Sequence, residues 1–188
     1  MIARLTIGIC VAVIALAVLL NFALAKAKAE KEKKSWVSTA SMVLFFLAFT
    51  VVLRRNWGAV DLPVGLRPPF EAAGALLVVF GTLLNVLGRL SLKGNWGDQI
   101  RIYGDHNLVT TGFYRYVRHP LYSGLLFIGY GCAMVYVNWL GAVLISAVFL
   151  PMMVYRASLE EKLLAERFPK YRDYARKTGM FLPKFLMK

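Results

Sequence analysis

The sequence has few of the features that build a small disulfide-linked or metal-bound domain. Its 188 residues include two cysteines, Cys10 and Cys132, and 10 acidic residues against 23 basic ones. Both cysteines lie within apolar stretches, which argues against a disulfide framework and a zinc site. There is also no Gly-x-Gly-x-x-Gly motif, the usual mark of a Rossmann nucleotide-binding unit. The length allows one domain.

Charged residues are missing from four long stretches, and 59% of all residues are hydrophobic, more than the roughly 45–50% of soluble proteins. These stretches cover residues 5–25, 35–53, 72–88 and 120–155. Because a membrane-crossing helix needs about 20 apolar residues, each of the first three predicts one span and the fourth predicts two. We expect the fourth to fold as a helical hairpin that turns near Tyr136–Trp139, where a polar residue and an interfacial aromatic coincide.

The sequence therefore predicts an all-α integral membrane protein with a single domain. Its five transmembrane helices are expected at about residues 5–25, 36–53, 70–89, 120–137 and 139–155. Residues 90–119 are predicted to be a cytoplasmic linker, and residues 156–188 a cytoplasmic segment with a C-terminal helix. The sequence Ala23-Leu24-Ala25 resembles a signal-peptidase site, but lysines follow the apolar region instead of preceding it, so we expect an uncleaved first helix.

The basic residues indicate the orientation. With the N-terminus outside, all of them except Arg4, Arg54, Arg55 and Arg67 fall in cytoplasmic segments, as the positive-inside rule requires. Most of the net charge of +13 then faces the anionic cytoplasmic leaflet, which explains the basicity without a nucleic acid partner. The lysine-rich residues 26–34 are expected to form a solvated loop that faces the lipid.

Glycines recur at a helical spacing in the third span. Gly74, Gly81 and Gly88 are seven residues apart, nearly two helical turns, so they share one face and allow another helix to approach closely. Glycines of the fourth span are expected to act similarly; these are Gly124, Gly129 and Gly131. This pattern predicts helix packing and no chemistry.

Two polar segments are brought together by the predicted hairpin. Pro120 suits the first position of the fourth span, so the free N–H groups there, with Arg115, Arg118 and His119 nearby, would attract a carboxylate or phosphate. The fifth span ends in exposed carbonyls followed by Glu160-Glu161, which would attract an ammonium or sulfonium. The two helix ends should lie roughly 8–10 Å apart.

A ligand that holds both kinds of charge would bridge these half-sites, and S-adenosylmethionine, with a carboxylate, an ammonium and a sulfonium, fits. The alternative interpretation is that these are ordinary interfacial charges, with snorkelling arginines and glutamates that begin a surface helix. Glu160 and Glu161 also point about 100° apart on a helix, so both need not enter one cleft.

Three sequence motifs resemble the isoprenylcysteine carboxyl methyltransferases, a family whose wider group includes integral-membrane phospholipid N-methyltransferases. The motifs are His106-Asn107-Leu108-Val109-Thr110-Thr111-Gly112-Phe113-Tyr114, Arg118-His119-Pro120-Leu121-Tyr122-Ser123-Gly124, and Glu160-Glu161-x-Leu163 with Phe168 and Tyr171-x-x-Tyr174. The similarity covers about residues 85 to 185. It departs from the family at Phe168-Pro169-Lys170-Tyr171, which is one residue shorter than the usual pattern and lacks its glycine.

The resemblance implies a membrane methyltransferase that uses S-adenosylmethionine without a Rossmann domain and without a metal. Carried over residue by residue, the cofactor-binding positions are His106, Leu108, Val109, Arg118, His119, Pro120, Tyr122, Gly124, Glu160 and Glu161. A carboxylate acceptor is already ionised and needs no general base, so an arginine clamp is the expected catalytic group, with Arg118 first and Arg115 second. A lipid-like or prenylated acceptor would enter laterally from the bilayer.

Three alternatives remain open. A phospholipid or amine N-methyltransferase of the same architecture would need a nearby base to remove a proton, with His106 as a candidate. A sterol-reductase-like, NADPH-dependent membrane reductase would need more basic residues for the dinucleotide phosphates. The third alternative is lipid binding without catalysis. The sequence leaves the oligomeric state open.

Overall fold

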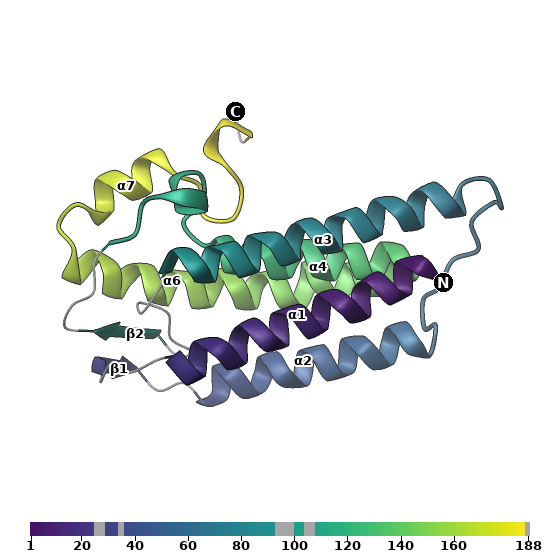
Figure 1. The fold of residues 1–188 in the computed structure, drawn as a ribbon, viewed down its shortest axis with the longest axis horizontal. Coiled ribbons are helices and arrows are strands. Elements are labelled where there is room, and N and C mark those ends of the chain that lie inside the picture. Colours follow the sequence, from purple (N-terminus) through teal and green to yellow (C-terminus); the bar gives the residue numbers. More distant parts are fainter. Residues whose placement is uncertain (25–28, 34–35, 93–99, 104–107, 187–188) are drawn as a thin grey trace.

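The computed structural model describes residues 1–24, 29–33, 36–92, 100–103 and 108–186 (Figure 1). Apolar helices dominate it, and they run side by side along the long axis of the molecule. They are α1 (Ile2–Leu24), α2 (Trp36–Arg54), α3 (Arg67–Leu92), α4 (Pro120–Val135), α5 (Trp139–Leu144) and α6 (Leu150–Arg167). A π-helical turn over Ile145–Phe149 joins α5 to α6, so Trp139–Arg167 is one long helical stretch.

The helical character of the chain is as predicted. Three helical stretches are long and apolar enough to cross a membrane, namely Ile2–Leu20, Arg67–Leu92 and Trp139–Arg167, and two shorter apolar helices cover Ala40–Arg54 and Pro120–Val135. Helix α3 starts before and ends after the predicted residues 70–89, and α6 continues to Arg167 instead of ending near 155. The helix therefore includes the first charged residues that follow the apolar run.

The predicted hairpin between α4 and α5 is present. The chain turns at Tyr136–Asn138, where Val137 has a positive φ of 47°. The Asn138 side chain accepts a hydrogen bond of 2.8 Å from the Gly141 N–H and so caps α5, while its amide donates to the Trp57 carbonyl at 2.9 Å. Pro151, which has no N–H to donate, follows at the start of α6 and accounts for the π-helical turn before it.

The glycines of α3 and α4 pack against each other as predicted. A Cβ on Gly81 would lie 2.5 Å from the Gly124 carbonyl oxygen, and one on Gly74 would lie 2.8 Å from that of Gly131. No side chain fits at these points, so the two backbones are in direct contact. The buried Asn85 in the same interface donates to the Leu121 carbonyl at 3.2 Å, which adds a polar contact between the helices.

The prediction that residues 26–34 form a loop is wrong for the part that the structure describes. Residues Ala29–Lys33 form strand β1, which pairs antiparallel with β2 (Ile100–Tyr103). This small sheet is an addition to the predicted all-α fold. The two strands follow different helices and are joined by a short ladder of hydrogen bonds. This pairing was not predicted because β1 alternates charged residues and has no hydrophobic pattern. The sheet lies at the end of the bundle where α1 ends (Figure 1).

The C-terminal part folds back over the beginning of α4. After α6 the chain forms α7 (Tyr171–Lys177) and then a segment, Thr178–Phe181, that we call the C-terminal strap. Val117 and Gly179 form a parallel bridge, and the N–H groups of Arg118 and His119 donate to the Gly179 and Met180 carbonyls at 2.8 and 3.1 Å. A 3-10 turn, η2 (Gly112–Arg115), precedes this contact and another, η4 (Lys184–Leu186), follows it.

Candidate functional site

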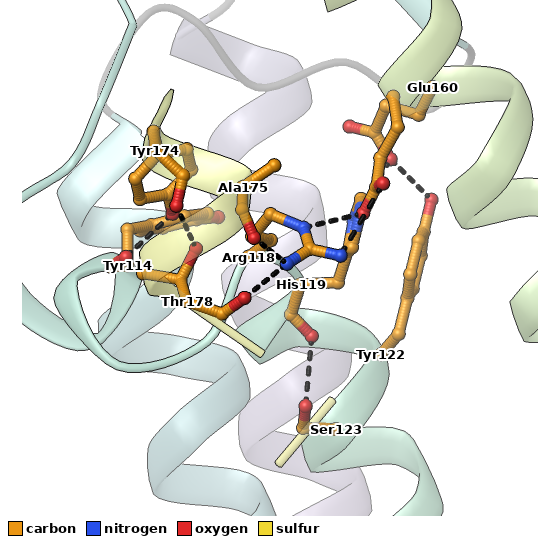
Figure 2. A network of polar contacts seen from close by, with 10 residues as sticks. Tyr114, Arg118, His119, Tyr122, Ser123, Glu160, Tyr174, Ala175 and Thr178 are labelled. Carbon is orange, nitrogen blue, oxygen red and sulfur yellow. Dashed lines mark hydrogen bonds and ion pairs between the residues drawn. The ribbon is translucent and has the colours of Figure 1, made fainter. Parts of the chain in front are cut away.

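The start of α4 and the end of α6 meet in a charged cluster, which we define as Arg118, His119, Glu160 and Glu161 (Figure 2). Arg118 donates from Nε to Glu161 Oε1 at 2.8 Å and from Nη2 to Oε2 at 3.5 Å. His119 contacts both carboxylates, with Nε2 3.0 Å from Glu161 Oε1 and Nδ1 3.5 Å from Glu160 Oε2. The hairpin therefore brings the two predicted half-sites into direct contact.

Two further side chains extend this cluster toward the apolar part of the bundle. The Tyr122 hydroxyl donates to Glu160 Oε2 at 3.1 Å and accepts from Arg156 Nε at 3.1 Å. The Tyr122 ring stacks on the imidazole of His119, with centroids 5.4 Å apart. Arg156 was not among the predicted site residues. It ends the 120–155 uncharged stretch and precedes Glu160 by four residues, a spacing that places both on one helix face and could have identified it.

His119 is buried among acidic groups. Its side chain is 5% exposed. Burial disfavours the charged imidazolium, but the hydrogen bonds and negative charges of Glu160 and Glu161 outweigh that effect and raise the pKa of His119 above 6.5. The raised pKa favours the imidazolium form, and the contacts of the ring with both carboxylates link α4 to α6.

Arg118 is fully engaged within the protein. Besides Glu161, its guanidinium donates from Nη1 to the carbonyls of Ala175 at 3.0 Å and of Thr178. The backbone N–H groups of Arg118 and His119, which precede α4, also donate to the C-terminal strap. Two of the three basic residues expected to attract a ligand anion are therefore hydrogen-bonded within the chain. Arg118 therefore fixes the position of Glu161. The positive charge of Arg118 is balanced by a carboxylate and by carbonyl groups of the same chain.

The two glutamates differ in exposure. The Glu161 side chain is 19% exposed and takes part in two ion pairs, whereas that of Glu160 is 36% exposed. Both reach His119 although they are consecutive on the helix, because each approaches a different nitrogen of the ring. The Glu160 side chain is therefore the more exposed of the two, and Glu161 is mainly the internal partner of Arg118.

The remaining predicted residues are more dispersed. Pro120 is buried at the first turn of α4, and Leu108 and Val109 are half-buried, while His106 lies outside the described residues. Gly124 is placed against α3, where a Cβ would meet the Gly81 carbonyl oxygen, so its contact is with a helix and not with the charged cluster. The presence of glycine at position 124 is therefore explained by the close packing of α4 against α3 as well as by the family motif.

Arg115 lies apart from the charged cluster. It is exposed at the end of η2 and lines a groove at the end of α3. The other residues lining this groove are mostly apolar; they are Leu87, Leu90, Ser91, Gly112, Phe113 and Tyr116. Leu87 and Leu90 are 41% and 64% exposed on the outer face of α3, so the groove opens beside a surface suited to lipid.

Hydrogen bonds from Tyr174 and Ser123 connect α7 and the C-terminal strap to the rest of the fold. The Tyr174 hydroxyl donates to the Tyr114 carbonyl at 2.6 Å, and burial raises the pKa of Tyr174 to about 12, so the hydroxyl keeps its proton. Ser123 of α4 donates to the Phe181 carbonyl at 2.7 Å. The motif resemblance pointed to Tyr174 without a role, and no sequence signal indicated that Ser123 would secure the strap.

The fold and the charged cluster together define an α-helical integral membrane protein with a polar site at one end of its bundle. Comparison with known sequences narrows the class. Residues 74–166, about half of the chain, match the sequence model described as the isoprenylcysteine carboxyl methyltransferase (ICMT) family, so this part of the chain is similar to that family. The match includes α4, most of α6 and all four residues of the charged cluster.

Individual relatives agree with the family match. A probable protein-S-isoprenylcysteine O-methyltransferase of Oryza sativa subsp. indica is 32% identical over 113 residues, 58% of this chain and 59% of the relative. The protein-S-isoprenylcysteine O-methyltransferase of Saccharomyces cerevisiae is 30% identical over 113 residues, which cover 58% of this chain and 47% of the relative. The chain thus matches about half of the length of these relatives.

A solved structure shares the fold. The eukaryotic intramembrane Ras methyltransferase ICMT superposes with a TM-score of 0.53 at 24% sequence identity, over 80% of this chain and 53% of that one. The shared fold agrees with a helical bundle in the membrane.

Proposed function

We propose that the protein transfers a methyl group from S-adenosylmethionine to the carboxylate of an isoprenylcysteine-type, lipid-like acceptor. The proposal rests mainly on the charged cluster, in which the family motif residues of α4 and α6 contact each other within 3.5 Å (Figure 2). The names of the relatives favour a carboxyl acceptor over an amine acceptor and over a reductase.

The proposed topology has five membrane crossings. The two shorter apolar helices, Ala40–Arg54 and Pro120–Val135, lie parallel to the three longer ones in the bundle (Figure 1). In this proposal the charged cluster and α7 lie on the cytoplasmic side and the N-terminus outside, which the positive-inside rule supports because most of the basic residues then face the cytoplasm. A water-soluble methyl donor would then reach the cluster from the cytosol.

The acidic side of the cluster fits the methyl donor. S-adenosylmethionine supplies an electrophilic methyl group on a sulfonium. The exposed face of Glu160 provides a carboxylate for its ammonium group, and the Tyr122 hydroxyl fixes the orientation of that carboxylate. Leu108 and Val109, half-buried in the loop before η2, are proposed to form another wall of the site, and His106 remains a predicted contact.

The structure favours Arg115 over Arg118 for the acceptor carboxylate. Arg118 is occupied by Glu161 and the C-terminal strap, so its role in the proposal is to position Glu161. Arg115 combines an exposed guanidinium with an apolar groove, which matches an acceptor that has a carboxylate at the end of a hydrocarbon chain. Such an acceptor could enter sideways from the bilayer past Leu87 and Leu90.

The chemistry asks little of the protein beyond alignment. An ionised acceptor carboxylate attacks in line and no proton has to be removed, so the absence of a free base in the charged cluster is compatible with turnover. The tasks left to the side chains are to orient the two reactants and to exclude water. An amine acceptor would need a base, and the two glutamates favour the protonated form of His119, the form that cannot accept a proton.

The test is methyl transfer with a labelled donor. Purified protein in lipid vesicles is given a farnesylated cysteine analogue or phosphatidylethanolamine as acceptor, and the labelled product is identified. We expect a base-labile methyl ester on the prenylated cysteine. Glu160→Gln should lose most activity, whereas Glu166→Gln, an exposed change of the same charge on the same helix, should not. Label only in phosphatidylethanolamine, or in neither acceptor, would contradict the proposal.

A further inference from the structure

A second pocket lies between the end of α6 and α7. Residues that line it include Ser158, Lys162, Tyr171, Arg172, Arg176 and Lys184. Four of these side chains are basic and exposed, and they come from three separate elements, α6, α7 and η4. The fold therefore gathers positive charge around one depression on this side of the bundle.

The acidic residues near this pocket do not neutralise it. Glu161 also lines the pocket, but it is already paired with Arg118 at 2.8 Å. Asp173 approaches Arg176 only to 3.8 Å, and both side chains are more than 70% exposed, which makes that pair weak. The pocket keeps a net positive charge that an anion could balance.

Tyr171, which also lines this pocket, carries a buried hydroxyl that lacks a hydrogen-bond partner among the described residues. The residue is 3% exposed. Buried hydroxyls are nearly always satisfied in folded proteins, because an unpaired one costs roughly 1–3 kcal/mol. Tyr171 lines the same pocket as the four basic residues, and a hydroxyl donor that lacks a partner among the described residues suits an oxygen-rich anion such as a phosphate.

The surroundings of the pocket favour a lipid as the source of that phosphate. Helix α6 is the end of an apolar stretch long enough to cross a membrane, so the pocket lies where the apolar region gives way to charge. Leu182 and Phe185, next to Lys184, are 45% and 67% exposed. Exposed apolar side chains beside basic ones can contact acyl chains while the cations bind headgroups.

We propose that the pocket between α6 and α7 binds the phosphate of an anionic glycerophospholipid headgroup. Lys162, Arg172, Arg176 and Lys184 surround the phosphate and Tyr171 donates a hydrogen bond to it. The pocket borders the charged cluster at Glu161, but binding of the phosphate requires neither the methyl donor nor the acceptor. It would attach α7, and with it the C-terminal strap, to the membrane surface.

The experiment measures lipid binding to the full chain in detergent by native mass spectrometry and by the thermal unfolding midpoint. Phosphatidylglycerol is titrated against phosphatidylcholine, and inorganic phosphate is tested against chloride at equal ionic strength. We expect phosphatidylglycerol to bind and to stabilise the protein, and phosphatidylcholine to do neither. Equal binding of the two lipids would overturn the proposal, and so would stabilisation by inorganic phosphate as large as that by phosphatidylglycerol.

Two double variants separate the pocket from general surface charge. Arg172→Gln with Arg176→Gln should weaken phosphatidylglycerol binding by at least about tenfold. Lys170→Gln with Lys177→Gln removes the same charge at exposed positions beside and within α7 that do not line the pocket, and should change binding less than about twofold. Equal losses in both variants would overturn the site. Lys162→Gln with Lys184→Gln repeats the test outside α7.

Replacing Tyr171 is expected to change the unfolding midpoint differently in the absence and in the presence of phosphatidylglycerol. Without lipid, Tyr171→Phe removes an unsatisfied buried hydroxyl and should raise the unfolding midpoint or leave it unchanged. With phosphatidylglycerol, the same variant should gain less stability than the wild type, because one hydrogen bond to the phosphate is lost. An identical gain in both proteins would show that Tyr171 does not contact the lipid and would overturn this part of the assignment.

Discussion

The α3–α4 interface and the charged cluster both bring helices into close contact, but they do so by opposite means. Between α3 and α4, glycines leave so little space that the carbonyl oxygen of Gly124 lies 2.5 Å from the place where a Cβ of Gly81 would be. At the ends of α4 and α6, long side chains reach across, and Arg118 and His119 bind Glu161. The small size of glycine allows the contact between α3 and α4, whereas opposite charges hold the ends of α4 and α6 together.

This difference shows which parts of the site can move. The glycine interface has no alternative arrangement, because backbone atoms are already in contact. In the charged cluster each of Arg118, His119, Glu160 and Glu161 contacts its partners through side-chain atoms, so the proposed binding of a ligand by Glu160 does not require the backbone to separate. The packing of α3 against α4 thus provides a rigid base, and the cluster provides the adjustable part.

The largest effect is expected in the rigid interface. Gly81→Val places a side chain against the Gly124 carbonyl oxygen and Ile128, and because backbone cannot give way it should destabilise the protein by more than about 3 kcal/mol. Gly8→Val in α1, where a Cβ meets no atom within 4 Å, is the matched control and should be nearly neutral. Thermal unfolding in detergent compares them. Equal midpoints would mean that α3 and α4 are not in backbone contact.

A smaller loss is expected when charge is removed from the cluster. Glu161→Gln leaves Arg118 and the protonated His119 without their shared carboxylate oxygen, which should cost about 2–3 kcal/mol of unfolding free energy. Glu166→Gln is the control on the same helix, at an exposed position. If both variants unfold like the wild type in denaturant titrations, the ion pairs contribute no net stability.

The same cluster should make stability depend on pH. Folding raises the pKa of His119 above 6.5, because the charge and hydrogen bonds of its two glutamates outweigh burial. The stabilisation is therefore complete below about pH 6.5 and is lost as the pH rises through the folded-state pKa. His119→Gln should flatten this decline above about pH 6.5. Parallel curves for variant and wild type would argue that the ring is neutral.

The smallest effect is expected at the C-terminal strap. Tyr174→Phe removes the hydrogen bond to the Tyr114 carbonyl and should cost about 1 kcal/mol. Hydrogen exchange of the Arg118 and His119 amides, which donate to the strap, should become faster in the variant. Unchanged exchange would show that the strap is held by its other contacts, such as that of Ser123.

Much of the helical scaffold could be predicted because its signals are local and periodic. Uncharged stretches predicted the helices, and the seven-residue glycine spacing predicted that another helix packs closely against α3. The polar residue in the fourth uncharged stretch predicted the turn of the hairpin, which ends at Asn138. Helix ends were less predictable, since α6 continues through Glu160 to Arg167 without a proline or glycine to stop it.

The details of the candidate site could not be predicted because they depend on contacts across long sequence separations. Nothing in the sequence indicates that Thr178 and Ala175 would accept hydrogen bonds from Arg118. The role expected of Arg118, a clamp for the acceptor, followed from residue type alone, whereas its partners depend on how α7 folds back. Pairing of β1 with β2 was missed for the same reason.

The central claim is that the charged cluster binds the methyl donor through Glu160. Isothermal calorimetry of the detergent-solubilised protein with S-adenosylhomocysteine, which keeps the ammonium group, tests it directly. The account predicts binding by the wild type and by Glu166→Gln, and a loss of at least about tenfold in affinity for Glu160→Gln, in line with a charged hydrogen bond worth roughly 1.5–3 kcal/mol. The same affinity in all three proteins would contradict it.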